Sequence, residues 1–137
     1  MYVGVVVAYN PQREEICKNI DTYINELDVL YVVDNSSKNN GDIFNGYNKV
    51  KYIPNYDNLG ISAALNIGAK EAINNKYKWI LTMDQDSHFE KDAISKMKEY
   101  INNSDKTNEK LGIVSPFHST KRTEGIKLEG VDYPILV

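Results

Sequence analysis

The amino-acid sequence predicts an α/β fold, with a mostly parallel sheet and helices on both of its faces. Strand-like and helix-like segments alternate along the 137 residues, and this order is typical of parallel strands joined by helical crossovers. The 42% apolar and 26% charged residues are the composition of an ordinary globular chain. Because a domain takes roughly 100–200 residues, we expect residues 1–137 to form one α/β domain.

The first part of the chain predicts three strands and one helix. Residues 3–8 are a nearly continuous β-branched run, which is typical of a strand buried on both faces. Asn10 and Pro11 are suited to the N-cap and the first position of a helix. The apolar stripe expected on that helix comprises Ile16, Ile20, Tyr23, Ile24 and Leu27. Residues 29–33 and 50–53 predict the second and third strands.

The second part of the chain predicts two further helices and two further strands. A helix is expected after Gly60, with one inward face formed by Ile61, Ala64, Leu65, Gly68, Ala72 and Ile73. Residues 79–83 predict the fourth strand and residues 111–114 the fifth. Between these two strands, a helix over about residues 92–101 turns four side chains inward: Ala93, Ile94, Met97 and Ile101.

Charge and apolar patterning argue against several classes of protein. Sixteen Lys and Arg against nineteen Asp and Glu give a net charge of −3, so nucleic-acid binding has no electrostatic basis. The fully apolar runs, such as residues 5–8, are far too short to span a bilayer. No secretory leader is recognisable, and the single cysteine, Cys17, favours a reducing compartment. We therefore expect a cytoplasmic protein.

The last residues, 132–137, end on an apolar run. Natural termini are usually polar and frayed. We therefore expect the chain to be a fragment of a longer protein, ending near the start of another strand.

Polar residues follow three of the predicted strands. Tyr9 and Asn10 come after the first strand, Asp34 after the second, and the triplet Asp-Gln-Asp at 84–86 after the fourth. In open parallel sheets, ligands bind in the crevice beyond the carboxyl ends of the strands. These residues are therefore the candidates for a ligand site.

The triplet suggests a cation site. Asp84 and Asp86, on a turning backbone, can present hard oxygen ligands to Mg²⁺ or Mn²⁺, which take further ligands from water and substrate phosphates. The alternative is that both carboxylates only close a turn. Neither a G-x-G-x-x-G nor a G-x-x-x-x-G-K-[ST] motif occurs, so recognition of a diphosphate here would depend on the metal.

The other polar residues suit a nucleoside. The Tyr9 ring can stack on a base, and Asp34 can accept a hydrogen bond from the imino N–H of uracil or thymine, which cytosine lacks. Asn58 and Gly60 can bring backbone N–H groups to a ribose or phosphate. The alternatives are a half-buried tyrosine at a sheet end, a cap on the turn after Asp34, and ordinary helix initiation.

Four segments together resemble the family-2 inverting glycosyltransferases, which have the GT-A fold. They are VVVAYNP at residues 5–11, VVDNS at 32–36, NLGISAALNIG at 58–68 and LTMDQDS at 81–87. The resemblance covers about residues 3–115 and is closest to the rhamnosyltransferase branch.

The resemblance implies a GT-A (Rossmann-like) domain that binds a nucleotide-diphosphate sugar, dTDP-rhamnose first and a UDP-sugar next, with Mg²⁺ or Mn²⁺. The acceptor would be a saccharide, such as a cell-surface polysaccharide, or a lipid-linked acceptor. The acceptor-binding half and the catalytic base are expected beyond Val137, and those missing regions could attach the enzyme to the inner face of the membrane. The resemblance implies metal contacts from Asp84 and Asp86, and nucleotide contacts from Ala8, Tyr9, Asn10, Asp34, Asn58, Gly60, Asp84 and Gln85.

Three other functions fit the sequence less well. A phosphoacceptor receiver domain needs an acidic pair near the end of its first strand and a lysine after its fifth. Here these places hold Tyr9-Asn10 and Ser115-Pro116. A non-catalytic binding domain, whose carboxylates only close turns, stays open. A nucleotidyltransferase lacks its glycine-rich, arginine-bearing loop after the first strand.

Overall fold

The computed structural model describes residues 1–107 and 111–115. Contacts divide the chain into two compact units, Met1–Phe89 and Glu90–Val137, and each unit is described by itself. The apolar residues expected at 135–137 lie outside the described residues.

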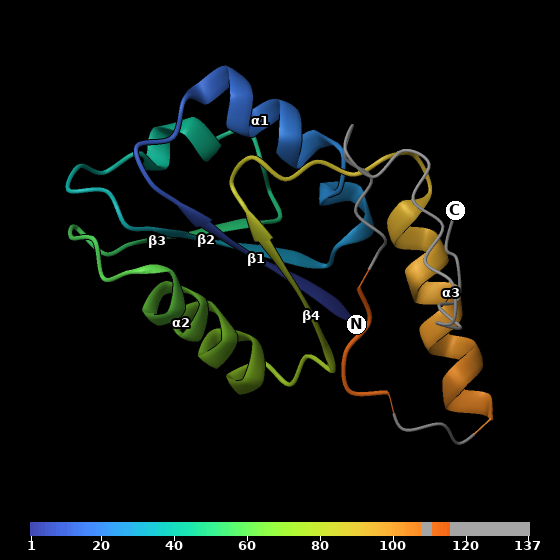
Figure 1. Ribbon diagram of the computed structural model, residues 1–137. Coiled ribbons are helices and arrows are strands. Elements are labelled where there is room, and N and C mark those ends of the chain that lie inside the picture. Colours follow the sequence, from blue (N-terminus) through green and yellow to red (C-terminus); the bar gives the residue numbers. More distant parts are fainter. Residues whose placement is uncertain (108–110, 116–137) are drawn as a thin grey trace, which may run out of the picture. The chain divides into compact units, whose positions relative to one another are not determined.

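The first unit is built on four parallel strands (Figure 1). They are β1 (Tyr2–Ala8), β2 (Val29–Asp34), β3 (Val50–Pro54) and β4 (Trp79–Asp84), in the spatial order β3-β2-β1-β4. Every pairing is parallel. The predicted α/β class with a parallel sheet is therefore confirmed, and all four predicted strands before residue 90 are present.

Two helices cover opposite faces of this sheet (Figure 1). Helix α1 (Arg13–Asp21) follows β1, and α2 (Ile61–Asn74) follows β3. Two short 3₁₀ helices, η1 (Ile24–Glu26) and η2 (Gly41–Phe44), lie in the connections on either side of β2. The crossovers leave all four strands pointing the same way, so their carboxyl ends meet at one end of the sheet.

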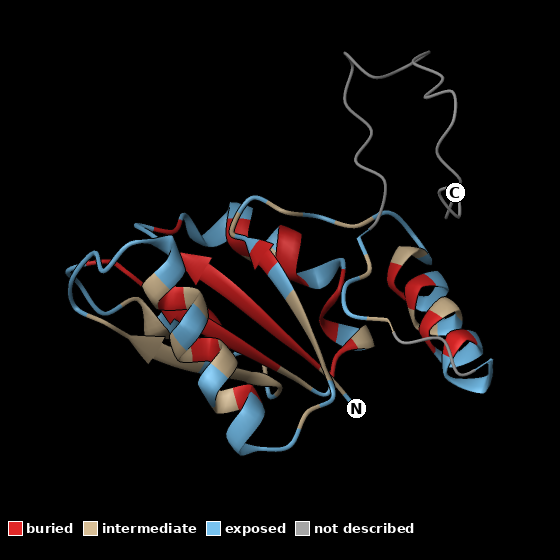
Figure 2. Ribbon diagram, turned by 60° about the horizontal axis from the view of Figure 1, so that its bottom comes forward, coloured by how far each residue is buried: buried red, intermediate tan, exposed pale blue. Residues whose placement is uncertain are grey.

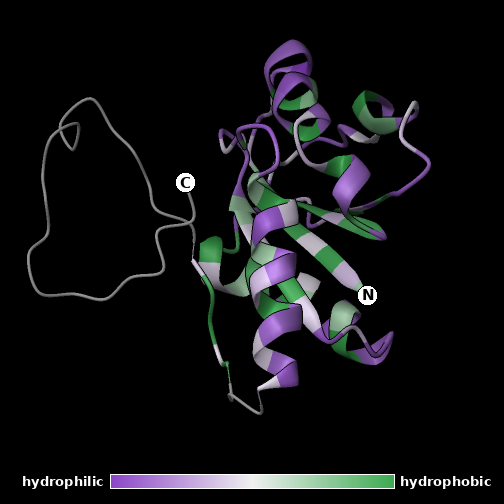
Figure 3. Cartoon of the chain, turned by 90° about the vertical axis from the view of Figure 1, so that its right-hand side faces the viewer, coloured by the Kyte–Doolittle hydropathy of each residue, from purple (hydrophilic) through white to green (hydrophobic). Residues whose placement is uncertain are grey.

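The core on the α2 face shows why that helix carries small residues. Val3, Val5 and Val7 of β1 form one buried cluster with Ala64 and Ala72 of α2, and the central strands are the most deeply buried part of the unit (Figure 2). The strands are also predominantly hydrophobic in Figure 3. A Cβ atom added at Gly68 would lie 2.3 Å from Cγ1 of Val5. The close approach of helix and sheet therefore depends on glycine at this position.

The predicted start of the first helix is wrong. Gln12 is the N-cap and the helix begins at Arg13, because Asn10 adopts a left-handed backbone with φ 45° and turns the chain before the helix starts. Asparagine tolerates this conformation better than most residues. The α-helix ends at Asp21, although all five residues of the predicted stripe are buried: Ile16, Ile20, Tyr23, Ile24 and Leu27.

The predicted inward face of α2 is correct only in part. Ala64, Gly68 and Ala72, four residues apart, are buried, whereas Ile61 and Ile73 are 61% and 67% exposed. Successive residues lie about 100° apart around a helix, so Ile73 lies off the buried face that Ala64, Gly68 and Ala72 form. The first turn, with Ile61, lies at the carboxyl end of the sheet.

The second unit contains α3 (Ala93–Lys106), which extends five residues beyond the predicted end. Its predicted residues Ile94, Met97 and Ile101 are buried. The fifth strand predicted at 111–114 is wrong, because these residues form no regular structure and Ile113 is 89% exposed. A short apolar run becomes a strand only by pairing with another strand. No helix in the described part of the chain is long and apolar enough to cross a membrane.

Candidate functional site

The carboxyl ends of the strands are aligned by the register of the sheet. Ala8 of β1 pairs with Asp34 of β2, Asp34 with Pro54 of β3, and Val7 with Asp84 of β4. The structure therefore brings the predicted strand-end residues to one end of the sheet, as the sequence predicts. We call residues 8–10, 34–36, 54–60 and 84–87 the carboxyl end.

Gln85 joins the ends of β1 and β4. Its Oε1 accepts a hydrogen bond from the Tyr9 N–H at 2.8 Å, and its Nε2 donates to the Tyr9 carbonyl at 3.3 Å. The Gln85 carbonyl in turn accepts from Nδ2 of the buried Asn19 on α1, at 3.1 Å. The side-chain amide of Gln85 thus bonds to both backbone groups of Tyr9 and holds Tyr9 beside the Asp-Gln-Asp triplet.

Tyr9 and Asn10 lie on the surface of this end. The Tyr9 side chain is 51% exposed, so its ring is accessible to a flat ligand. Asn10 turns the chain away from the sheet, and its backbone N–H donates to Oγ of Ser36 at 2.7 Å. This bond links the loop after β1 to the turn after β2.

Asp34 is fully buried and accepts four hydrogen bonds. Its Oδ1 accepts from the backbone N–H of Ser36 at 2.9 Å and from the Ser36 hydroxyl. Its Oδ2 accepts from Nδ2 of Asn40 at 2.8 Å and from the Tyr52 hydroxyl at 2.7 Å. Desolvation by burial and the hydrogen bond to Asp34 raise the pKa of Tyr52 to about 12, so this hydroxyl stays a neutral donor. The Ser36 contacts are those expected of a turn cap.

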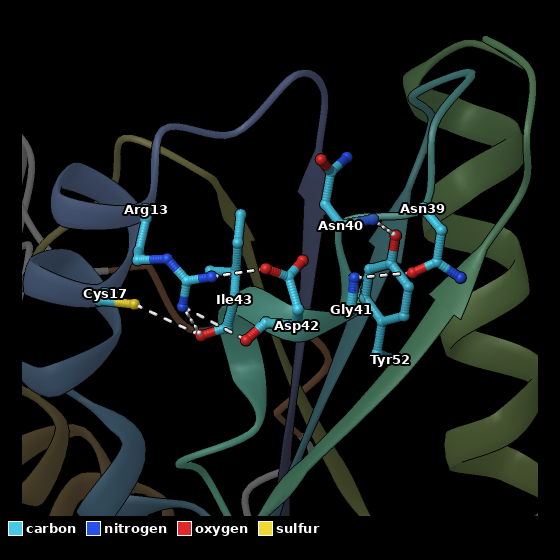
Figure 4. Close-up of polar contacts among 8 residues, drawn as sticks. All are labelled: Arg13, Cys17, Asn39, Asn40, Gly41, Asp42, Ile43 and Tyr52. Atoms are coloured by element: carbon cyan, nitrogen blue, oxygen red, sulfur yellow. Dashed lines mark hydrogen bonds and ion pairs between the residues drawn. The ribbon is translucent and has the colours of Figure 1, made fainter.

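The segment 39–43 is held from both sides (Figure 4). On one side the Tyr52 hydroxyl accepts from the Asn40 N–H at 2.8 Å. On the other side Arg13 forms a 2.6 Å ion pair with Asp42 and donates to the carbonyls of Asp42 and Ile43. These contacts fix the backbone of the loop beside Asp34.

Asn58 and Gly60 shape the entry to α2. Gly60 has φ 83°, a backbone conformation that favours glycine, and its N–H donates to Oδ1 of Asn58 at 3.1 Å. Nδ2 of Asn35 donates to the Gly60 carbonyl at 3.2 Å. The predicted pair therefore forms an ordinary helix start that is tied to the end of β2.

Asp84 and Asp86 present free carboxylates. The turn after β4 is closed by backbone groups of Asp84 and by Ser87: the Ser87 N–H donates to the Asp84 carbonyl at 3.0 Å, and the Asp84 N–H donates to Oγ of Ser87 at 3.2 Å. Among the described residues, no group donates a hydrogen bond to either side-chain carboxylate. A hollow of about 30 Å³ beside Asp86 is lined by Pro11, Gln12, Glu15, Ile16, Gln85 and Asp86.

These two carboxylates fit a divalent cation that takes most of its ligands from elsewhere. They are exposed oxygen donors separated by one residue, Gln85, and carboxylate oxygens are the ligand type that Mg²⁺ and Mn²⁺ prefer. Within residues 1–107 and 111–115, no group of three or more His, Cys, Asp or Glu side chains could form a complete metal cage. Phosphates and water would therefore have to supply the remaining ligands.

Asn19, Asn40 and Tyr52 are site residues that the sequence analysis missed. Each acts through a partner in another element or loop: Asn19 is 66 residues from Gln85, whereas Asn40 and Tyr52 are 6 and 18 residues from Asp34. Tyr52 lies two residues before Pro54, the partner of Asp34 in the sheet, and thus on the same face, but this relation depends on the register of the sheet, which cannot be predicted from the sequence.

Four parallel strands, helices on both faces and polar groups at the carboxyl end define a Rossmann-like α/β ligand-binding domain. The sequence model of glycosyl transferase family 2 matches residues 5–133, so the chain belongs to this family and the fold is GT-A. Membership makes it a glycosyltransferase that binds a nucleotide-sugar donor and an acceptor. None of the curated proteins compared with the chain matches it.

Proposed function

We propose that this chain is the nucleotide-sugar-binding domain of a metal-dependent, inverting glycosyltransferase of the rhamnosyltransferase-like branch. The proposed donor is dTDP-rhamnose, with a UDP-sugar as the second candidate, and the proposed acceptor is a saccharide or lipid-linked group. The observation that carries the proposal is that Asp84 and Asp86, with no described hydrogen-bond donor, lie at the same end of the sheet as Tyr9 and Asp34.

The base of the donor is proposed to lie between the Tyr9 ring and the end of β2. Stacking on an exposed aromatic ring contributes roughly 1–3 kcal/mol per base in nucleic-acid complexes, and the same contact is available here. Asp34 would accept the imino N–H of uracil or thymine. This contact accounts for both proposed donors, because UDP and dTDP share that donor group.

The diphosphate is proposed to lie over the turn after β4. Asp84 and Asp86 would hold Mg²⁺ or Mn²⁺, which would supply positive charge to neutralise a leaving diphosphate. An acceptor hydroxyl attacks the anomeric carbon from the face opposite the diphosphate. The new carbon–oxygen bond forms as the bond to the diphosphate breaks, and the hydroxyl proton passes to a general base that we assign to no described residue.

Calorimetry with UDP or dTDP in the presence of Mn²⁺ tests the proposal. The wild-type chain is expected to bind both nucleotides, and Asp86→Ala to weaken binding at least tenfold, because a carboxylate ligand of the cation is lost. Glu99→Ala is the matched control: it removes one negative charge from an exposed position on α3 and should leave binding unchanged. No binding at millimolar nucleotide, or equal binding by Asp86→Ala and wild type, would contradict the proposal.

A further inference from the structure

The carboxylate of Asp34 has no free capacity for another donor. A carboxylate offers about four lone-pair sites, and the Asp34 oxygens already accept from Ser36 twice, from Asn40 and from Tyr52. A ligand N–H can therefore bind to Asp34 only if one of these donors leaves.

The Ser36 and Tyr52 donors are firmly held. Ser36 is fully buried and lies two residues from Asp34, in the same turn. The Tyr52 ring stacks on Phe44 with centroids 5.5 Å apart, and its oxygen also accepts from the Asn40 backbone. Moving Ser36 away from Asp34 would disturb the turn, and moving the Tyr52 hydroxyl away would require the whole ring to leave its packing on Phe44.

The side chain of Asn40 is the donor that can be exchanged. It is half-buried, and its Nδ2 also donates to the Lys38 carbonyl at 3.2 Å, so a second acceptor lies within its reach. Arg13 and Tyr52 fix the backbone on either side of the loop (Figure 4). Rotation of one side chain is therefore enough to free Oδ2 of Asp34.

We propose that the Asn40 amide occupies, in the free protein, the acceptor that the imino N–H of uracil or thymine takes in the complex. The inference rests on the proposed function, since it assumes that Asp34 reads the base. One N–H replaces another, so Asp34 keeps four hydrogen bonds when the base is uracil or thymine. Cytosine has no donor at this position, and displacing Asn40 would leave a buried carboxylate short of one partner, a costly state. Discrimination against cytosine therefore comes from Asp34, and Asn40 lowers the affinity for every nucleotide whose base must displace it.

The test compares the binding of UDP and CDP to the wild-type chain and to Asn40→Ala by calorimetry. Removing the competing amide is expected to tighten UDP binding three- to tenfold, the value of about one hydrogen bond, and to leave the preference for UDP over CDP at or above its wild-type value. Asn39→Ala is the matched control, because its side chain contacts Gly41 and Tyr56 but not Asp34. It should leave both affinities unchanged.

Asp34→Asn separates this inference from the proposed function. If the wild-type chain binds neither nucleotide, the proposed function fails. If UDP binds equally well to wild type and Asp34→Asn, Asp34 does not accept a hydrogen bond from the base, and the inference about Asn40 is wrong. If Asp34→Asn abolishes binding while Asn40→Ala binds UDP no more tightly than wild type, the exchange alone is overturned.

A spectroscopic readout covers the case in which Asn40→Ala does not fold. In the wild-type chain, the side-chain amide protons of Asn40 should shift and exchange faster with water when UDP is added. Those of Asn39 should change little. An Asn40 amide that stays unshifted at saturating UDP would overturn the proposal.

Discussion

Tyr52→Phe removes one hydroxyl from the centre of the Asp34 network. That hydroxyl donates to Oδ2 of Asp34 at 2.7 Å and accepts from the Asn40 N–H at 2.8 Å. The ring itself, stacked on Phe44, is kept. The substitution therefore isolates two hydrogen bonds without creating a cavity in the ring packing.

The expected loss of stability depends on whether each hydrogen bond of the Tyr52 hydroxyl involves a charged or a neutral group. A hydrogen bond to a charged group contributes about 1.5–3 kcal/mol and a neutral one about 1 kcal/mol. Tyr52 and Asn40 are only half-buried, so water replaces part of what is lost. We expect the free energy of unfolding to fall by about 2 kcal/mol, which lowers the urea midpoint by roughly 1 M at an m-value near 2 kcal/mol/M.

Urea unfolding followed by far-UV circular dichroism measures this change. Tyr56→Phe is the matched control, because its hydroxyl accepts a single bond, from Asn39, on an exposed side chain. That variant should stay within about 0.5 kcal/mol of wild type. Equal midpoints for Tyr52→Phe and Tyr56→Phe would refute the view that the Tyr52 hydroxyl supports the buried carboxylate.

Three further predictions concern pH, packing and the link between β1 and β4. Because the pKa of Tyr52 is about 12 in the folded chain and its ordinary value is 10.0, its contribution to stability is complete below pH 10. That contribution is lost as the pH rises through about 12. In Tyr52→Phe, the free energy of unfolding should therefore fall less steeply between pH 10 and 12 than in the wild-type chain. Gly68→Val places a Cβ 2.3 Å from Val5 and should lower the free energy of unfolding, measured by thermal denaturation, by about 1–3 kcal/mol. Gly46→Ala is the control, because a Cβ added there meets nothing within 4 Å, and it should leave the free energy of unfolding unchanged. Gln85→Leu removes both hydrogen bonds between the ends of β1 and β4 and should raise the Kd for UDP several-fold in calorimetry; an unchanged Kd would show that this link does not shape the site.

Most of the sheet could be predicted because its strands are short, mainly apolar segments bounded by turn residues. The register could not, because it depends on which residues face each other across neighbouring strands. The fifth strand shows the limit: residues 111–114 have the apolar character of a strand but not its structure. The start of α1 was missed for a local reason, since the left-handed backbone of Asn10 outweighs the preference for proline at the first position of a helix.

The location of the candidate site could also be predicted, since the carboxyl ends of parallel strands must meet. The contacts within it could not. From the sequence, Asp34 is expected to be an available hydrogen-bond acceptor. In the structure, its side chain accepts hydrogen bonds from Asn40 and Tyr52, which are 6 and 18 residues away. Gln85 reads as a ligand contact, yet its amide binds the backbone of Tyr9. Such pairings arise from the fold, and no spacing along the chain encodes them.

The central claim is that the nucleotide of the donor binds at the carboxyl end of the sheet. Adding UDP and Mg²⁺ to the ¹⁵N-labelled chain and following backbone amide shifts by NMR tests it directly. The largest shifts are expected at Tyr9, Asn35 and Gln85, with Tyr2 and Asp28 at the opposite end of the sheet unchanged. Shifts concentrated at Tyr2 and Asp28, or none at saturating nucleotide, would contradict the claim.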